Sequence, residues 1–513
     1  MRFYTSFYQK GSKLNVRGYE DGKKFFERHD ITPSLYIVNN SDTSNTTDKG
    51  FYGESLRRVD FETPWEARDF IKNNQDMKIY GYPNFEYSKV NELFGVDYDT
   101  SLLSTCYIDI ETKVGDDCDE DRAHNFESFP SIEDPHHEVS LITFLLDGIV
   151  NVYMTDDNFN QQEVIAEVYD KRPQAKDLPI EFNFQSFRDE RLMLATFVLT
   201  IEQQKPDIIT GWNTEGFDIP YLCQRIGKII GEDTVKRLSP FNDVTSRYIN
   251  SKFGNKELRF DIKGIQCLDY LELYRKFELS PRENYKLETI TQLELGAGKL
   301  DYTGSFKNFY QTKWSKFVSY NIIDVLLVYI LNDKLGFIDV AASMAHAAKC
   351  VYTDVFRVTR VWDNIIANYC VDAGIQVPTN FSNKRMAYEG AFVKPTIPGL
   401  YKWIASFDIA SLYPSIIMQN NISPETILPE HEFMPMTAQD MIHLTGNYDE
   451  AIQNARNLNA TLSANGALFS KEKEGVIPTL IGIYMKERKA AKKEMFIWAN
   501  KVEHAKARLR DAN

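Results

Sequence analysis

The feature that most constrains this chain is an acidic pair on one face of a predicted strand. Residues 102–112 (LLSTCYIDIET) alternate apolar and polar side chains around the pair, which predicts a half-buried strand. Asp109 and Glu111 are two residues apart, so both carboxylates point to the same face. Such like charges repel unless a cation lies between them. Considered alone, a solvent-facing acidic pair is the simpler interpretation.

Two further carboxylates belong to predicted helices. Residues 211–218 (GWNTEGFD) follow a short buried strand and open a helix, with Asp218 at its start. Tyr320 and Asp324 are four residues apart in the long helix predicted for 314–335, so they share one helical face. Considered alone, Asp218 is more simply explained as a helix N-terminal acid that complements the helix dipole. Considered alone, the pair in the long helix is more simply explained by ordinary amphipathicity.

Together the three elements predict a metal site. Four carboxylates can hold two divalent cations about 3.5–4 Å apart, which generate hydroxide from water and stabilise a leaving oxygen. Ligands that are all oxygen favour Mg²⁺ or Mn²⁺. We therefore expect two cations to be bound by Asp109, Glu111, Asp218 and Asp324.

A second candidate site lies in residues 406–417 (SFDIASLYPSII). A strand is predicted for 403–409, with a turn and a helix after it. Consecutive backbone N–H groups in such a turn can cradle phosphate oxygens while Asp408 holds the bridging metal. Tyr413 offers a flat wall against a sugar and can exclude a 2′-hydroxyl. The simpler interpretation is a strand–turn–helix with a capping aspartate.

Charge and composition exclude several classes of protein. The net charge is −14, from 59 Lys and Arg against 73 Asp and Glu, which alone argues against nucleic acid as the main partner. The distribution is uneven, however: residues 109–138 hold eleven acids and two bases, and residues 486–510 hold nine bases and three acids. The first stretch can hold metal and the second phosphate. The six cysteines form no C-x-x-C pair. We expect no signal peptide, and no membrane-spanning segment because no apolar run approaches the ~18–20 residues of a transmembrane helix.

The motifs resemble those of the family B DNA polymerases. The order D-x-E, N-x-x-x-F-D and Y-x-x-x-D resembles the three exonuclease motifs of proofreading polymerases, and DIASLYPSII resembles motif A. Residues 211–221, 319–325, 336–339 and 407–427 look specifically like the T-even bacteriophage type. The resemblance covers essentially the whole chain, in order. It implies a multidomain α/β fold (mixed α+β) with an RNase H-like 3′→5′ exonuclease domain.

The resemblance also implies an order of domains. We expect an N-terminal domain at 1–104, the exonuclease domain at 105–336, a return segment of the N-terminal domain at 337–380, a partial palm with motif A at 381–467 and the first part of the fingers at 468–513. The hairpin predicted for 251–260 resembles the one that helps to pass a primer between two active sites.

Further residues acquire roles through the same resemblance. Tyr320 of the Y-x-x-x-D motif would orient the water that attacks in the exonuclease reaction. Ser411, Leu412 and Tyr413 of motif A would contact the incoming nucleotide. Residues 488–493 (RKAAKK) resemble the family's R-K-x-x-K fingers segment, whose Arg488 and Lys492 would grip the triphosphate. Without motif A upstream, a solvated basic helix would be the default interpretation. DNA would be contacted by Asn213, Phe217, Tyr388, Gly390 and Lys299.

Segments that the family needs for DNA synthesis are not found in this sequence. There is no K-x-x-x-N-S-x-Y-G segment (motif B), no D-T-D segment with the second palm carboxylate (motif C), and no thumb. Asp408 therefore lacks its partner, and two-metal phosphoryl transfer needs both. We therefore expect this chain to be the N-terminal subunit of a split replicative DNA polymerase. We expect it to act in the cytoplasm of an infected bacterial host. Its partners would be primer–template DNA and single-stranded 3′ ends, dNTPs, a C-terminal polypeptide with motifs B and C and the thumb, and a sliding clamp reached through that polypeptide.

Three alternatives stay open at this point. The chain is also explained as a standalone 3′→5′ DNA exonuclease with a vestigial polymerase part, as an artificial fragment of a full polymerase, or as a non-catalytic replisome scaffold. Intact Asp408, Tyr413, Arg488 and Lys492 argue against the vestigial site. The complete set of acids argues against the scaffold.

Overall fold

A six-stranded mixed sheet organises the part of the chain that carries the predicted acids. Its strand order is β11-β10-β9-β8-β12-β15. Strand β9 runs antiparallel to both of its neighbours, β10 and β8. The pairs β10–β11, β8–β12 and β12–β15 are parallel. The strands span Thr105–Thr112 (β8), Val139–Leu146 (β9), Ile149–Met154 (β10), Glu181–Ser186 (β11), Ile208–Thr210 (β12) and Gln266–Cys267 (β15). Strand β9 is buried along its whole length, which accords with its largely apolar sequence (VSLITFLL).

This computed structural model describes residues 1–39, 48–114, 130–250, 256–296, 298, 306–379, 395–429, 432–433, 440 and 443–512. The chain divides into two compact units. The first unit holds Met1–Pro33, Phe61–Glu66 and Asn84–Ile365, and the second holds Ser34–Asp60, Ala67–Pro83 and Ile366–Asn513. This division does not follow the expected domain boundaries, which therefore stay a prediction.

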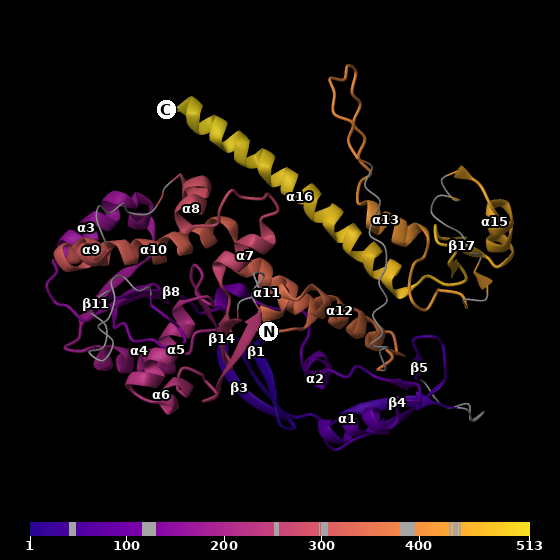
Figure 1. Cartoon of the computed structure of the whole chain (residues 1–513), viewed down its shortest axis with the longest axis horizontal. Helices are drawn as coiled ribbons and strands as arrows, with labels where there is room; N and C mark the ends of the chain where they lie inside the picture. Colours follow the sequence, from indigo (N-terminus) through magenta and orange to yellow (C-terminus); the bar gives the residue numbers. More distant parts are fainter. Residues whose placement is uncertain are drawn as a thin grey trace. The chain divides into compact units, whose positions relative to one another are not determined.

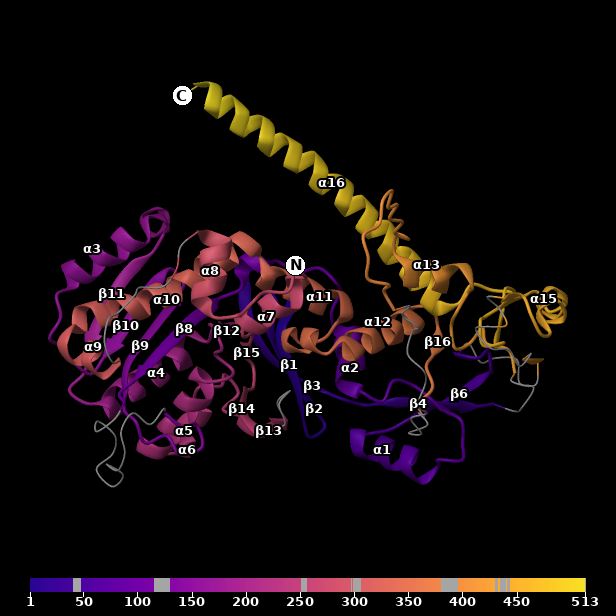
Figure 2. The same ribbon diagram turned by 45° about the horizontal axis from the view of Figure 1, so that its top comes forward.

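Helices cover both faces of the six-stranded sheet (Figures 1 and 2). Helices α4 (Glu190–Gln204) and α5 (Asp218–Ile229) pack on the face formed by Ile108 and Ile110 of β8. Helix α10 (Trp314–Leu335) contacts β8 and β9, and α3 (Gln161–Lys171) packs against α10. The remaining helices of this unit are α2 (Phe85–Leu93), α6 (Glu232–Lys236), α7 (Tyr270–Phe277), α8 (Leu287–Leu295), α9 (Phe306–Thr312) and α11 (Phe337–Ala348), with the short 3-10 turns η1 (Thr100–Leu102), η4 (Pro173–Asp177) and η5 (Tyr352–Phe356).

Helix α10 corrects one expectation from the sequence. An 18-residue window of this helix is apolar enough to cross a membrane, so a run of that length does exist. Of that window, 72% is buried inside the fold. Most of the apolar surface therefore packs on the sheet and on α3, as in the core helix of a globular domain.

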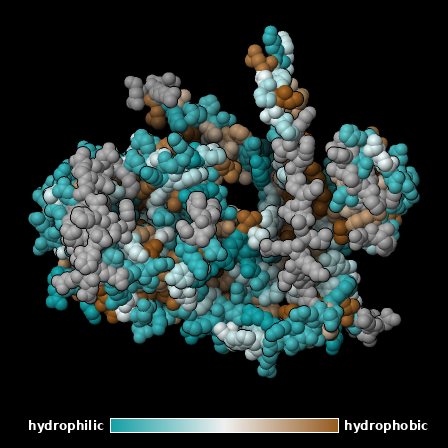
Figure 3. All heavy atoms as spheres, viewed as in Figure 1, coloured by the Kyte–Doolittle hydropathy of each residue, from teal (hydrophilic) through white to brown (hydrophobic). Residues whose placement is uncertain are grey.

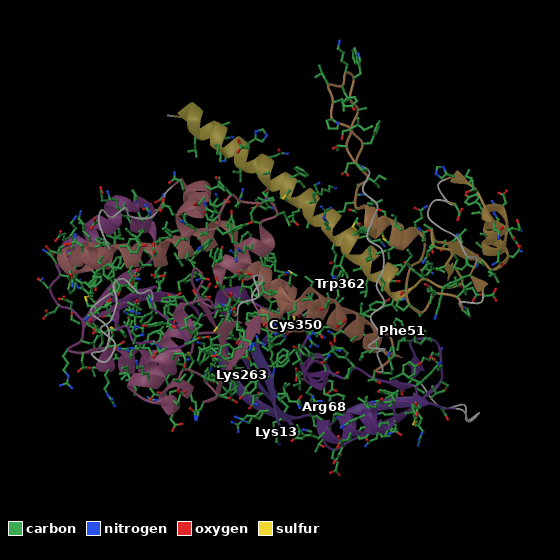
Figure 4. All side chains as sticks on the ribbon, viewed as in Figure 1. Lys13, Phe51, Arg68, Lys263, Cys350 and Trp362 are labelled. Atoms are coloured by element: carbon green, nitrogen blue, oxygen red, sulfur yellow. The ribbon has the colours of Figure 1, made fainter. Side chains whose placement is uncertain are left out.

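An antiparallel sheet at the N-terminus belongs to the same unit. Strands β1 (Arg2–Lys10), β2 (Lys13–Glu20) and β3 (Lys23–Asp30) follow one another as a meander. Arg17 of β2 reaches the start of β12, where it forms a buried ion pair with Asp207 at 2.7 Å. Figure 4 shows Lys263 beside this sheet, with its ammonium 5.6 Å from the centre of the Tyr8 ring.

The predicted hairpin is longer than expected. Strands β13 (Val244–Asn250) and β14 (Lys256–Ile262) pair antiparallel from Val244 opposite Ile262 to Asn250 opposite Lys256. Residues 251–255, where the turn was predicted between the two strands, lie outside the described residues.

The second unit is built from short sheets and helices. Strands β4 (Ser34–Val38), β6 (Leu56–Asp60) and β7 (Ile79–Tyr80) form one sheet, β5 (Lys49–Gly50) pairs with β16 (Ile375–Gln376), and β17 (Ala460–Leu462) pairs with β18 (Leu468–Ser470). Its helices are α13 (Leu412–Gln419), α15 (Tyr448–Asn457) and the long α16 (Val476–Ala512). Two helices run across the division of the units: α1 (Pro64–Asn73) and α12 (Val358–Asp372). At the start of α1, the N–H of Glu66 donates to Thr63 Oγ1 at 3.3 Å.

Candidate functional site

The acidic pair lies on β8, as predicted. Ile108 and Ile110 are buried in the core, whereas Asp109 and Glu111 are only half buried on the opposite face. The alternation of the strand therefore separates core side chains from site side chains. Asn321 of α10 donates from its Nδ2 to Asp109 Oδ2 at 2.5 Å. This contact ties the acidic face of β8 to α10.

Asp218 is held at the edge of β8. Strand β12 ends at Thr210, so the N–H of Ile110 has no strand partner on that side. Asp218 Oδ1 accepts this N–H at 3.1 Å, and its side chain is 4% exposed. Ile110 lies between Asp109 and Glu111 in the chain. Asp218 is thus fixed to the backbone that carries the other two acids.

A tight turn brings Asp218 to this position. A Cβ atom at Gly211 would lie 2.3 Å from the carbonyl oxygen of Ile108, so a larger residue does not fit there. Asn213 has a left-handed backbone (φ +66°), which asparagine tolerates better than most residues. The N–H groups of Gly216 and Phe217 both donate to the carbonyl oxygen of Asn213, at 2.9 and 3.0 Å. The Phe217 ring stacks on Tyr221 of α5 at 5.3 Å.

Asp269 holds this turn, and the sequence interpretation missed it. Its carboxylate accepts three backbone N–H groups: Asn213 at 3.0 Å, Glu215 at 3.1 Å and Leu271 at 2.9 Å. Burial raises the pKa of Asp269 to about 6, although these three hydrogen bonds oppose the shift. Burial and the nearby Asp269 also raise the pKa of Glu215 to about 7. The local signal was an aspartate before an apolar helix start, since Asp269 is the N-cap of α7.

Tyr320 and Asp324 lie on α10, the helix that contacts β8. Asp324 is 3% exposed, and Tyr320 is half buried with its ring edge-on to Phe309. Asn321, the residue after Tyr320, makes the contact to Asp109. The structure therefore brings the three predicted acidic elements around β8.

The donor chemistry of this site fits a hard divalent cation, because the four predicted ligands are all carboxylates. Within the ranges that the structure describes, no group of three or more His, Cys, Asp and Glu side chains has already gathered around one point as metal ligands do. Holding one cation would therefore require these carboxylates to move closer together, which their mutual repulsion opposes until a cation is bound.

The residues of the second candidate site are exposed. The strand predicted for 403–409 is wrong, since this segment pairs with no described strand, Trp403 has a left-handed backbone (φ +60°), and Trp403 and Phe407 are 100% and 93% exposed. A strand needs hydrogen bonds from a neighbour, and no described strand pairs with this segment. Asp408 follows in the same exposed stretch. Ser411 has a left-handed backbone (φ +53°) and precedes α13.

Leu412 and Tyr413 begin α13, which packs against the first part of α16. Tyr413 is 72% exposed. Arg488 and Lys492 project from the exposed part of α16. In the described part of the chain, no hydrogen bond or ion pair joins Asp408, Arg488 and Lys492 to one another. The predicted residues Tyr388, Gly390 and Lys299 lie outside the described residues.

Comparison with known proteins matches both halves of the chain. Residues 84–290 match the family described as DNA polymerase family B, exonuclease domain, and residues 343–511 match DNA polymerase family B. The DNA-directed DNA polymerase of Enterobacteria phage T4 is 32% identical over 96% of this chain and 54% of its own length. That of Escherichia phage RB69 is 30% identical over 100% of this chain and 56% of its own length. DNA polymerase 1 of Pyrococcus abyssi is 26% identical over 69% of this chain and 43% of its own length. The chain thus spans about half the length of the phage relatives.

Proposed function

Because this chain belongs to the family B DNA polymerases, we propose that it is the N-terminal subunit of a split replicative polymerase that shortens DNA 3′ ends. It carries a complete 3′→5′ exonuclease site and half of a polymerase site. A C-terminal polypeptide supplies the rest for DNA synthesis. The observation that carries the exonuclease is the convergence of β8, the 211–218 turn and α10 through the contacts of Asp109 and Asp218.

The reaction is hydrolysis of the terminal phosphodiester bond. A water oxygen forms a bond to phosphorus, the bond from phosphorus to the 3′ oxygen breaks, and the water proton ends on that oxygen. The products are a deoxynucleoside 5′-monophosphate and a DNA chain shortened by one residue. Mg²⁺ or Mn²⁺, two per site, supplies a hydroxide nucleophile and stabilises the leaving oxygen when bound.

The chain's own residues arrange this reaction. Asp109, Glu111, Asp218 and Asp324 hold the cations, and Tyr320 orients the attacking water. Asn321 fixes Asp109 through its hydrogen bond, and the Ile110 N–H fixes Asp218. Asn213, Phe217, Lys299, Tyr388 and Gly390 contact the DNA strand.

The polymerase half depends on a partner in this proposal. Asp408 holds one metal, Ser411, Leu412 and Tyr413 contact the dNTP, and Arg488 and Lys492 bind its triphosphate. The second palm carboxylate comes with motif C of the C-terminal polypeptide, through which a sliding clamp is also reached. The assembled enzyme acts in the cytoplasm of an infected bacterial host.

Exposed apolar surface supports a protein partner. Met495, Phe496 and Trp498 of α16 are 57%, 55% and 57% exposed. Figure 3 shows further apolar side chains on the segment that includes Trp403 and Phe407. Apolar patches of this kind mark protein–protein interfaces. We expect an interface of the obligate type, which buries more than about 2,000 Å².

The test is a paired assay of the purified chain with Mg²⁺ and a labelled primer–template, with and without dNTPs. We expect the primer to shorten in both reactions, Asp109→Ala to abolish shortening, and the exposed-site control Asp157→Ala to leave it intact. Primer extension by this chain alone would contradict the need for a partner. No activity in either reaction would favour the scaffold.

Addition of a polypeptide with motifs B and C and the thumb should restore extension. If it binds but extension still fails, the standalone exonuclease with a vestigial polymerase part is favoured. If the native protein runs on past residue 513 and extends primers as one polypeptide, the division into subunits is wrong and the assignment of the sites is unchanged.

A further inference from the structure

A cavity of about 230 Å³ lies beside α10, beyond Asp324. Leu327, Ile330 and Lys334 line it from α10, at the helical spacing that places them on one face. Arg172 and Gln174 line it from the end of α3 and the turn that follows. None of these side chains has a role in the proposed hydrolysis.

Arg172 is a buried cation with unused hydrogen-bond donors. The residue is 6% exposed, and its Nη1 donates to the carbonyl oxygen of Lys171 at 2.5 Å. Its Nε and Nη2 are buried and have no hydrogen-bond partner among the described residues. Burial lowers the pKa of this guanidinium, which Glu288 and Asp324 oppose. A buried charge with unpaired donors is costly unless a ligand pairs with it.

The acid in the wall of the cavity is already occupied. Glu294 accepts from Arg282 Nη2 at 3.0 Å and from Tyr274 Oη at 2.8 Å, and its Oε2 lies 3.3 Å from Lys334 Nζ. Its negative charge is thus paired with Arg282 and Lys334, and neither of its oxygens accepts a hydrogen bond from Arg172. The lining carries Arg172 and Lys334 against Glu294, which leaves one net positive charge.

The two unused donors of Arg172 define the chemistry of the ligand. Nε and Nη2 lie on one edge of the planar guanidinium, where their N–H bonds run parallel. This edge binds two oxygens of one phosphate or carboxylate group at the same time. The tetrahedral phosphate dianion is the better fit, because its further oxygens can accept from the second cation and from the amide of Gln174.

We propose that this cavity is a binding site for a phosphate dianion, either inorganic phosphate or the 5′-phosphate of a mononucleotide. Arg172 binds two of its oxygens through Nε and Nη2, and Lys334 adds a second positive charge at the rim. None of the four proposed metal-binding carboxylates lines the cavity, and binding of the phosphate to Arg172 needs no metal. It therefore persists when divalent cations are removed.

The test is calorimetric titration of the full chain in buffer with a chelator, using inorganic phosphate, deoxythymidine monophosphate and thymidine as probes. We expect binding of one or both phosphate probes and none of thymidine. Arg172→Met should weaken that binding at least about tenfold. The matched control Lys171→Met removes the neighbouring exposed charge and should bind as wild type does.

Two results would overturn the proposal: no phosphate binding by the wild type, or equal binding by wild type and Arg172→Met. If the wild type binds deoxythymidine monophosphate more tightly than inorganic phosphate, the cavity is a nucleotide site. If it binds the two phosphate probes with equal affinity, the cavity is a phosphate site. If Arg172→Met does not fold, Lys334→Met replaces it, with weakened binding expected, and unchanged binding would count against the proposal. Phosphate should also raise the Tm of the wild type.

Discussion

The hydrogen bonds of Asp269 predict a defined loss when this residue becomes asparagine. Oδ1 accepts from Asn213 and Leu271, and Oδ2 accepts from Glu215, so each carboxylate oxygen is in use. In Asp269→Asn, one oxygen becomes an NH₂ group that cannot accept an N–H. At least one backbone N–H of the turn is then left buried without a partner.

The magnitude follows from these contacts. A hydrogen bond to a charged group contributes about 1.5–3 kcal/mol, and an unsatisfied buried donor costs about 1–3 kcal/mol. We expect Asp269→Asn to lower the free energy of unfolding by about 2–4 kcal/mol. Because the same turn positions Asp218, the rate of 3′-end hydrolysis should fall by about 10- to 100-fold, equivalent to about 1.4–2.8 kcal/mol.

Urea unfolding and single-turnover hydrolysis of a labelled single strand measure the two effects separately. The matched control is Asp233→Asn, a fully exposed acid on α6 in the same unit. A role in positioning Asp218 predicts a lower rate at saturating DNA with the KM for DNA little changed. If Asp269→Asn folds with wild-type stability and cleaves at the wild-type rate, the turn does not depend on this carboxylate.

Three further outcomes are expected. Asp207→Ala should lower the free energy of unfolding by about 3–5 kcal/mol, because Arg17 would stay buried without its counter-charge. A urea midpoint equal to that of the wild type would refute this. Burial raises the pKa of Glu215 from an ordinary value of 4.5 to about 7, so the folded state binds more protons than the unfolded state between these pH values, and stability should fall as pH rises through them. Glu215→Gln should flatten that fall in a pH series of denaturant midpoints, and an unchanged slope would contradict the assignment. Chelation of divalent cations should abolish shortening of DNA 3′ ends, and Mg²⁺ or Mn²⁺ should restore it; shortening that persists in chelator would exclude the metal-dependent reaction.

Local patterns predicted the elements that carry the acids. The alternation around Asp109 and Glu111 gave a strand, and the apolar spacing of 314–335 gave a helix with the observed bounds. Each of these patterns is contained within one element. The family membership expected from the motifs is confirmed by the comparisons.

Features that depend on distant partners were not predictable in this way. Asp269 acts on a turn 54 residues earlier in the chain, which no local pattern reveals. The strand expected at 403–409 failed for a related reason, since its composition suits a strand but no described strand pairs with it. The hairpin strands exceeded the prediction because residues 244–250 pair despite being largely exposed.

The ion pair between Arg17 and Asp207 limits how modular this protein can be. Asp207 also accepts from Thr5 Oγ1 at 2.9 Å and from Tyr19 Oη at 2.8 Å. Residues of the N-terminal sheet therefore both neutralise its buried charge and hydrogen-bond its oxygens. An excised nuclease domain that begins at residue 105 would expose this aspartate and lose these three partners, together with the Ser104 N–H that donates to Asp207 Oδ2 at 3.0 Å. Recombination during evolution, or a designed fusion, must therefore transfer the N-terminal sheet together with the nuclease sheet.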